Sequence, residues 1–303
     1  MALSIHTNYS SLVTQTNLSK TNNMLGNNQQ RLGTGLRINS AADDAAGLQI
    51  ATRLNSQARG MEVAMRNTGD ATSMLQTAEG AFQEMTDILQ RMKDLSTQAA
   101  NGTNGGADLI SMQAEYDELG KEVANIIKNT TYAGSNLFSD GTLVTGAGGK
   151  LSAAVDFQIG ATAAEKLTLN VTAKLTALGT ALTAAADTYA TPGTPGVELA
   201  STQDPTTAAN TNASANITVV STALDAVGDL RALFGANINR LNHTASNLGN
   251  MKDNTEMAKG RIMDADFAKE SANMTKNSML MQSGISMLKQ ASQMPGMVMS
   301  LLG

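Results

Sequence analysis

A long run of apolar residues at alternating spacings of three and four constrains this chain more than any other feature. It begins at Leu54 and continues to Ala99, and eleven of its fourteen positions are apolar. This period is typical of a helix that packs lengthwise against another helix. The positions are Leu54, Gln57, Met61, Ala64, Thr68, Ala71, Leu75, Ala78, Phe82, Met85, Leu89, Met92, Ser96 and Ala99. Such a helix, about 70 Å long, needs partners from elsewhere in the chain or from other chains.

The pattern changes beyond this helix. A Gly- and Asn-rich break at 101–106 is followed by helical spacing from Leu109 to Ile126, which predicts an antiparallel helical hairpin. Short alternating stretches between Gly-rich turns then predict strands at 130–132, 157–159 and 167–171. Residues 173–216 are rich in Ala, Thr and Gly and contain three of the four prolines. We expect that stretch to pack poorly, as a surface segment.

Both ends of the chain carry weaker helical patterns. Helical spacing returns between Leu224 and Leu248, and Pro295 is expected to end the last helix. The terminal seam comprises Leu18, Leu25, Leu32, Met274, Met281, Ile285 and Leu288. Neither terminal helix is expected to be stable alone, so the simplest arrangement pairs them. These patterns predict a mainly α fold: long antiparallel, coiled-coil-like helices pairing the N- and C-terminal parts, with a small β-hairpin region.

The composition argues against several classes of protein. Charged residues make up 16% of the chain, below the roughly 25% usual in soluble domains, so the surface suits packing against copies of itself. Net charge is −5 without basic clusters, which argues against nucleic acid as a partner. The absence of Cys excludes disulfides and thiolate metal sites. The sequence has no run of about 18 apolar residues, so membrane insertion is not expected. The N-terminus lacks the pattern of a cleavable signal peptide.

No catalytic, cofactor or metal site is expected. His6 and His243, the two histidines, belong to no metalloprotease motif or recognisable nucleophile motif. The pair at 43–44 could bind a cation but lacks the ligand ladder of a calcium loop. We favour a helix first turn at 43–44, with Ser40 as its N-cap. The glycines at 33–35 lack the strand and lysine of a phosphate-binding loop.

Two segments resemble the signatures of bacterial flagellins, the subunits of flagellar filaments. Residues 31–47 resemble the N-terminal signature and residues 260–268 the C-terminal one, and shorter matches occur at 5–8 and 299–302. The resemblance extends over roughly 1–170 and 215–303. It marks as assembly residues Leu36, Arg37, Ile38, Asn39, Asp43, Asp44, Arg261, Ile262, Asp266 and Phe267.

The resemblance implies a non-enzymatic structural subunit that self-polymerises into an extracellular filament for motility. It implies export by the flagellar type III route, with an export chaperone, a cap protein and a hook–filament junction protein as partners. It also implies an inner terminal-helix domain of residues 1–45 plus 258–303. An outer core domain of 46–172 plus 215–257, with short strands, and a short variable surface segment of 173–214 complete the expected organisation.

The resemblance further implies recognition of the monomer by the flagellin-sensing Toll-like receptor. In many flagellins the long helix and its hairpin partner form the surface that this receptor reads. The matching residues, which are also expected at a filament interface, are Leu89, Gln90, Arg91, Leu95 and Glu115.

Three other classes of protein share some of these features with a filament subunit. A hook–filament junction protein shares both chain ends, but it forms one ring instead of a long filament. An enzyme-bearing flagellin would need a catalytic constellation. A type III secreted effector or translocon protein would need an apolar membrane-inserting stretch. The sequence shows neither of the last two features.

Overall fold

The chain divides into two compact units. The computed structural model describes residues 8–139, 148–186, 189, 196–199 and 209–302. Unit 1 comprises Met1–Ala58 and Lys252–Gly303, and unit 2 comprises Arg59–Met251. Two long helices, α2 (Ala45–Ala99) and α6 (Ala209–Met263), contribute residues to both units.

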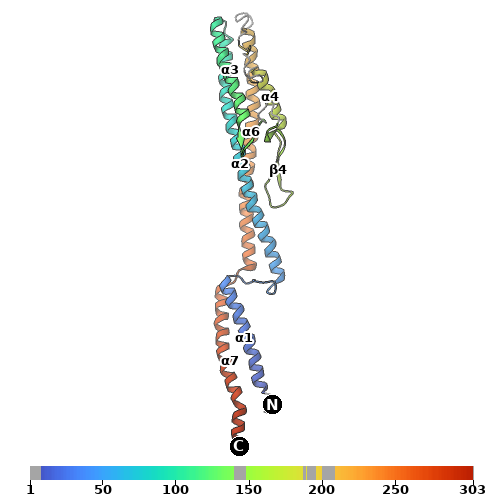
Figure 1. Ribbon diagram of the computed structural model, residues 1–303, viewed down its shortest axis with the longest axis vertical. Helices are drawn as coiled ribbons and strands as arrows, with labels where there is room; N and C mark the ends of the chain where they lie inside the picture. Colours follow the sequence, from blue (N-terminus) through green and yellow to red (C-terminus); the bar gives the residue numbers. More distant parts are fainter. Residues whose placement is uncertain (1–7, 140–147, 187–188, 190–195, 200–208, 303) are drawn as a thin grey trace. The chain divides into compact units, whose positions relative to one another are not determined.

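Unit 1 is built on the pairing of α1 (Tyr9–Thr34) with α7 (Phe267–Leu302), which lie side by side in Figure 1. The two helices are antiparallel, because Arg31 lies beside Glu270 at one end and Asn8 beside Ala291 at the other. The structure therefore confirms the expected pairing of N- and C-terminal helices.

The last helix does not end where the sequence suggested. We expected Pro295 to stop it, but α7 continues to Leu302. A proline within a helix removes one backbone N–H and crowds the carbonyl four residues earlier. Here that carbonyl, of Ala291, accepts a hydrogen bond from the Asn8 side chain at the N-terminus of α1 in place of the missing N–H.

Unit 2 confirms the long seam of α2. Every seam position from Met61 to Ala99 is buried, and the two earlier positions, Leu54 and Gln57, are not. α6 presents a matching stripe, whose buried members recur every seven residues: Ala213, Val220, Val227, Phe234, Leu241 and Leu248. Phe82 of α2 lies between Phe138 and Phe234, with ring centroids 4.8 and 5.6 Å away. The fold is mainly α, as predicted.

The third helix of unit 2 and its strands also agree with the sequence. Helix α3 (Gly106–Asn129) follows the predicted break. The hairpins are β1 (Thr131–Tyr132) with β2 (Ser135–Asn136) and β3 (Val155–Gln158) with β4 (Lys166–Leu169), both antiparallel. The turn between β1 and β2 has positive φ at both central residues, the backbone that suits a tight hairpin. A short 3-10 helix, η1 (Lys150–Ser152), precedes β3.

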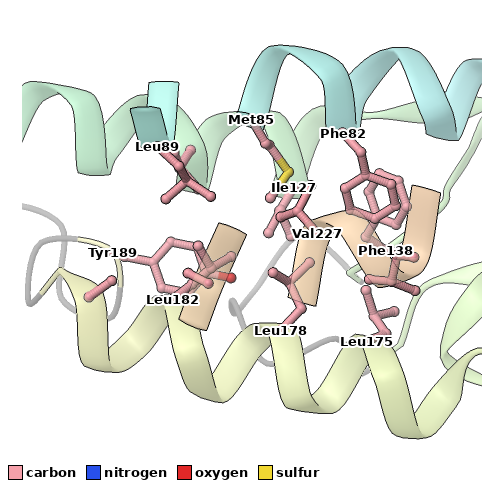
Figure 2. Packing of buried hydrophobic residues seen from close by; sticks show 14 of the residues in the cluster. Phe82, Met85, Leu89, Ile127, Phe138, Leu175, Leu178, Leu182, Tyr189 and Val227 are labelled. Carbon is pink, nitrogen blue, oxygen red and sulfur yellow. The ribbon is translucent and has the colours of Figure 1, made fainter. Parts of the chain in front are cut away.

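The expectation that residues 173–214 form only a poorly packed surface segment was wrong for its first part. Thr172–Ala185 forms α4, with Leu175, Leu178 and Leu182 buried at spacings of three and four. Figure 2 shows these leucines directed toward Phe82, Met85 and Leu89 of α2 and Val227 of α6. Low complexity in Ala and Thr concealed an apolar stripe that is sufficient to dock a helix. The part of the segment at 187–188, 190–195 and 200–208 lies outside the described residues.

Candidate assembly and recognition surfaces

The two signature segments meet in unit 1. The Arg37 N–H donates to the Met263 carbonyl at 2.7 Å, and Leu36 forms an antiparallel bridge with Asp264. The Arg37 guanidinium adds a bond of 2.9 Å from Nη2 to the Ile262 carbonyl. Residues far apart in the sequence therefore form one backbone-paired junction. The shorter matches differ: 5–7 lie outside the described residues, and 299–302 fall in the last turn of α7.

The segment after α1 reaches this junction through a left-handed turn. Gly35 has φ +71°, a conformation that side chains with a Cβ rarely adopt, and its carbonyl accepts from the Ala265 N–H at 2.9 Å. Ile38 is then only 1% exposed, and the Asn39 amide donates to the Leu36 carbonyl at 3.0 Å. This part of the first signature therefore provides a turn at Gly35, a buried side chain at Ile38 and a side-chain hydrogen bond from Asn39.

The two acidic residues of the first signature have separate roles. Asp43 Oδ2 accepts the backbone N–H groups of Ser40 (2.9 Å) and Asn39 (3.1 Å) and the Ser40 hydroxyl, and these bonds lower the pKa of Asp43. Asp44 Oδ1 accepts from the Gly47 N–H at 2.8 Å, as the N-cap of α2. Our assignment of Ser40 as the N-cap was therefore wrong, because Ser40 donates to Asp43 instead.

The second signature starts α7. Asp266 Oδ1 accepts from the backbone N–H groups of Ala268 (3.0 Å) and Lys269 (3.1 Å), which caps the helix. Phe267, the first residue of the helix, is 59% exposed, and Arg261 is also exposed. The signature therefore combines a cap that shapes the chain with an aromatic ring that unit 1 does not bury.

The seam between α1 and α7 is only partly apolar. Half-buried side chains recur at the expected spacing: Leu18, Leu25, Leu32, Met274, Met281 and Leu288. Leu18 packs over Gly284, where an added methyl group would lie 3.2 Å from Leu18 Cδ1. Ile285 does not belong to the seam as we expected, because its side chain is 45% exposed on another face of α7.

A buried polar layer interrupts this seam. Asn28, Glu270 and Asn277 are 8, 7 and 9% exposed. With its amide oriented to satisfy both neighbours, Asn28 donates to Glu270 Oε2 at 3.3 Å and accepts from Asn277 Nδ2 at 3.1 Å. Glu270 also pairs with Arg31 at 3.3 Å. Buried polar pairs at seam positions specify helix register at a cost in stability.

Unit 1 leaves many large apolar side chains in solvent. Eleven of the fifteen exposed large hydrophobic residues in the described part of the chain belong to it: Tyr9, Leu12, Val13, Met24, Ile50, Met257, Phe267, Met279, Leu280, Ile285 and Met287. Met279 and Leu280 also line an open apolar hollow on α7, with Ala272 and Thr275. Contiguous exposed apolar surface is typical of regions that other molecules cover.

The expected receptor segment lies on α2 and α3 of unit 2. Arg91 Nε and Nη2 donate to Glu115 Oε1 at 2.8 and 2.6 Å, and both side chains are about half exposed. Gln90 is also exposed. Leu89 and Leu95 are 0 and 1% exposed, so our placement of these two leucines on a contact surface was wrong. They belong to the core beneath that surface.

Two groups of buried polar residues in unit 2 escaped the sequence analysis. Asn216 Nδ2 donates to the Tyr116 hydroxyl at 2.7 Å, and that hydroxyl donates to the Ala185 carbonyl at 2.6 Å. Gln113, on α3, accepts from the Leu199 N–H at 2.7 Å and donates to Glu198. Asn216 follows the buried Ala213 by three residues, so the seven-residue repeat of α6 could have predicted that Asn216 is buried. Gln113 lies one residue past the expected seam and gave no such signal.

Neither a metal-ligand cluster nor a membrane span occurs among the described residues. Among them, no three His, Asp or Glu side chains gather as a metal site would require. No helix in that part of the chain is long and apolar enough to cross a membrane. His243 is exposed on α6, and His6 lies outside the described residues.

Comparison with known proteins matches both ends of the chain. Residues 5–142 match the bacterial flagellin N-terminal helical region, and 217–302 match the C-terminal helical region. Flagellin A of Vibrio anguillarum is 34% identical and flagellin C of the same organism 35% identical, each alignment covering 100% of both chains. The crystal structure of Bacillus cereus flagellin is 29% identical, with a TM-score of 0.45, covering 60% of this chain and 88% of that chain.

Proposed function

Since this chain belongs to the bacterial flagellin family, whose members are self-polymerising structural subunits of the flagellar filament, we propose that unit 1 is its inner assembly domain and unit 2 its outer core domain. The observation that carries this proposal is the exposed apolar surface of unit 1. An isolated subunit would leave Phe267, Met279 and Leu280 in water, and neighbouring copies would bury them.

The first test is polymerisation followed by negative-stain electron microscopy, after seeding purified chain with short filament fragments. We expect long uniform filaments from the wild type. Met279→Ser with Leu280→Ser should raise the concentration needed for growth, whereas Thr275→Ser, a one-methyl change in the same hollow, should not. Rings or persistent monomers from the wild type would favour the junction-protein alternative. Equal growth of all variants would exclude this face of α7 from the interface.

The same exposed surface supports the proposed export partners. Before assembly, α7 needs a cover for Met279, Leu280 and Met287, all more than 45% exposed. We assign that cover to a flagellar export chaperone, which would deliver the subunit to the type III export route. The filament would then grow beneath a cap protein and be attached to the hook through a hook–filament junction protein. Co-purification with the chaperone should be lost with the Met279→Ser and Leu280→Ser changes. Binding that survives them would place the chaperone elsewhere.

Recognition of the monomer by a flagellin-sensing Toll-like receptor is the second part of the proposal. The paired, half-exposed side chains of Arg91 and Glu115, with Gln90 beside them, supply a polar surface above a rigid core. Because an exposed ion pair contributes at most about 1 kcal/mol to stability, Arg91→Ala should fold normally yet weaken activation of receptor-bearing cells. Lys121→Ala, which breaks the exposed Lys121–Glu118 pair on α3, is the matched control. Undiminished activation by Arg91→Ala would exclude this assignment.

A further inference from the structure

Pro295 removes one hydrogen bond from the interior of α7. In an α-helix each carbonyl accepts from the N–H four residues later, so the Ala291 carbonyl would be paired with residue 295. Proline has no backbone N–H. Helix α7 nevertheless runs through this position to Leu302. The Ala291 carbonyl is therefore an acceptor for which the helix itself provides no donor of the usual kind, at a residue that is only 8% exposed.

The missing donor comes from the other end of the sequence. Asn8 Nδ2 donates to the Ala291 carbonyl at 2.6 Å, across a separation of 283 residues. The same side chain accepts from the Ser11 N–H at 3.1 Å through Oδ1, as the N-cap of α1. The side-chain amide of Asn8 thus makes two hydrogen bonds. Its oxygen caps the start of α1, and its nitrogen donates to the carbonyl that Pro295 leaves without a helical donor.

We propose that Asn8 and Pro295 together set the register of α1 on α7. Pro295 leaves one carbonyl of α7, that of Ala291, without its usual donor. Only one alignment of α1 on α7 places the Asn8 amide against that carbonyl. The seam alone specifies register weakly. Its half-buried leucines and methionines repeat at regular intervals, so they could pack again if one helix slid by one turn. The polar layer of Asn28, Glu270 and Asn277 specifies the other end of the pair.

Asparagine is the residue type that this position requires. Serine and aspartate are equally good N-caps, but serine is too short to span both helices and an ionised aspartate only accepts hydrogen bonds. Asn8→Ser therefore keeps the cap of α1 and removes the donor to Ala291. Pro295→Ala restores an N–H to α7 and makes the Asn8 donor redundant.

The test measures register by disulfide formation in the full chain, which has no cysteine of its own. Leu18→Cys with Gly284→Cys reports the observed alignment, and Leu18→Cys with Leu288→Cys reports a slip of one turn. We expect Asn8→Ser to shift the ratio of these two disulfides about fivefold toward the slipped pair, as expected for the loss of one hydrogen bond. In the Pro295→Ala background the same change should have no effect. Asn17→Ser, at an exposed position of α1, is the control.

Two outcomes would overturn the proposal. An unchanged ratio in Asn8→Ser would show that the amide does not set register. An equal shift with and without Pro295 would show that Asn8 acts through its cap alone. The ratio of the two disulfides reports the alignment of α1 on α7 directly, so its failure is distinct from a failure to form filaments.

Discussion

The Asn216 amide donates a hydrogen bond of 2.7 Å to the Tyr116 hydroxyl inside the core of unit 2, where α6 faces α3. The hydroxyl in turn donates to the Ala185 carbonyl at the end of α4. Three helices are thereby joined through one oxygen atom, and the buried Ser96 hydroxyl of α2 accepts a second bond from the Asn216 amide at 3.3 Å. The Tyr116 hydroxyl is satisfied by the other two groups together, as acceptor from Asn216 and donor to Ala185.

Removing that oxygen should be costly. Tyr116→Phe removes the donor to the Ala185 carbonyl and leaves the Asn216 amide with Ser96 Oγ as its acceptor, and a buried unpaired group costs about 1–3 kcal/mol. We expect the free energy of unfolding of unit 2 to fall by about 1–3 kcal/mol in urea denaturation. Tyr132→Phe removes an exposed hydroxyl that donates to the Asp70 carbonyl and should cost less than about 1 kcal/mol. Equal losses would mean that burial of the network is unimportant.

Acid should weaken the junction of the two signatures through Asp43. Its pKa is lowered by hydrogen bonds from the Ser40 and Asn39 N–H groups and the Ser40 hydroxyl. A lowered folded-state pKa contributes stability above the pKa of the unfolded chain, near 3.9, and loses it as pH falls through the folded value. Asp43→Asn should therefore be less stable at pH 7 and show a flatter stability profile between pH 5 and pH 2.

The measurement is thermal unfolding across that pH range. Ser40→Ala keeps the two backbone donors to Asp43 and should show an intermediate profile. If Asp43→Asn retains the full acid dependence of the wild type, other carboxylates are responsible.

The sequence predicted long-range architecture better than it predicted individual surfaces. The stripe from Met61 to Ala99 was recognised because helix packing repeats at a fixed interval that any long stretch reveals. α4 was missed because its composition was given more weight than the spacing of Leu175, Leu178 and Leu182. The error at Leu89 was avoidable, because this leucine already belonged to the predicted seam. Leu95 lies outside the seam but ends a second apolar row at intervals of seven, after Met74, Ala81 and Ile88, which the single seam did not include.

The polar layer of unit 1 gives a matched pair of variants. Asn28→Ala leaves Glu270 Oε2 and Asn277 Nδ2 without their shared partner, whereas the adjacent Asn27 is exposed. We expect Asn28→Ala to lower the stability of the α1–α7 pair by about 1–3 kcal/mol and Asn27→Ala to change it by less than about 0.5 kcal/mol. Thermal dissociation of assembled chains would report the difference. A similar effect of both changes would argue that the layer is solvated.

Two helical glycines should respond oppositely to alanine. A Cβ on Gly60 of α2 would lie 2.7 Å from the Ala161 Cβ in the β3–β4 turn, whereas a Cβ on Gly228 of α6 would meet nothing within 4 Å. Gly228→Ala should therefore stabilise unit 2 by about 0.5–1 kcal/mol through helix propensity. Gly60→Ala should destabilise the chain despite the better helix propensity of alanine, because the backbone at Ala161 would have to shift to make room for the added Cβ. Stabilisation by both changes would show that the β3–β4 turn yields easily.

The pairing of α1 with α7 has a consequence for the nascent chain. A ribosome that has completed Arg31 must add 239 residues before Glu270 exists. At about 5–20 residues per second, this delay is on the order of 10–50 s. During that time α1 has no intramolecular partner and is too weak a helix to persist alone. A product truncated anywhere before α7 can never complete unit 1, so the contacts that order the subunit also discriminate against unfinished copies.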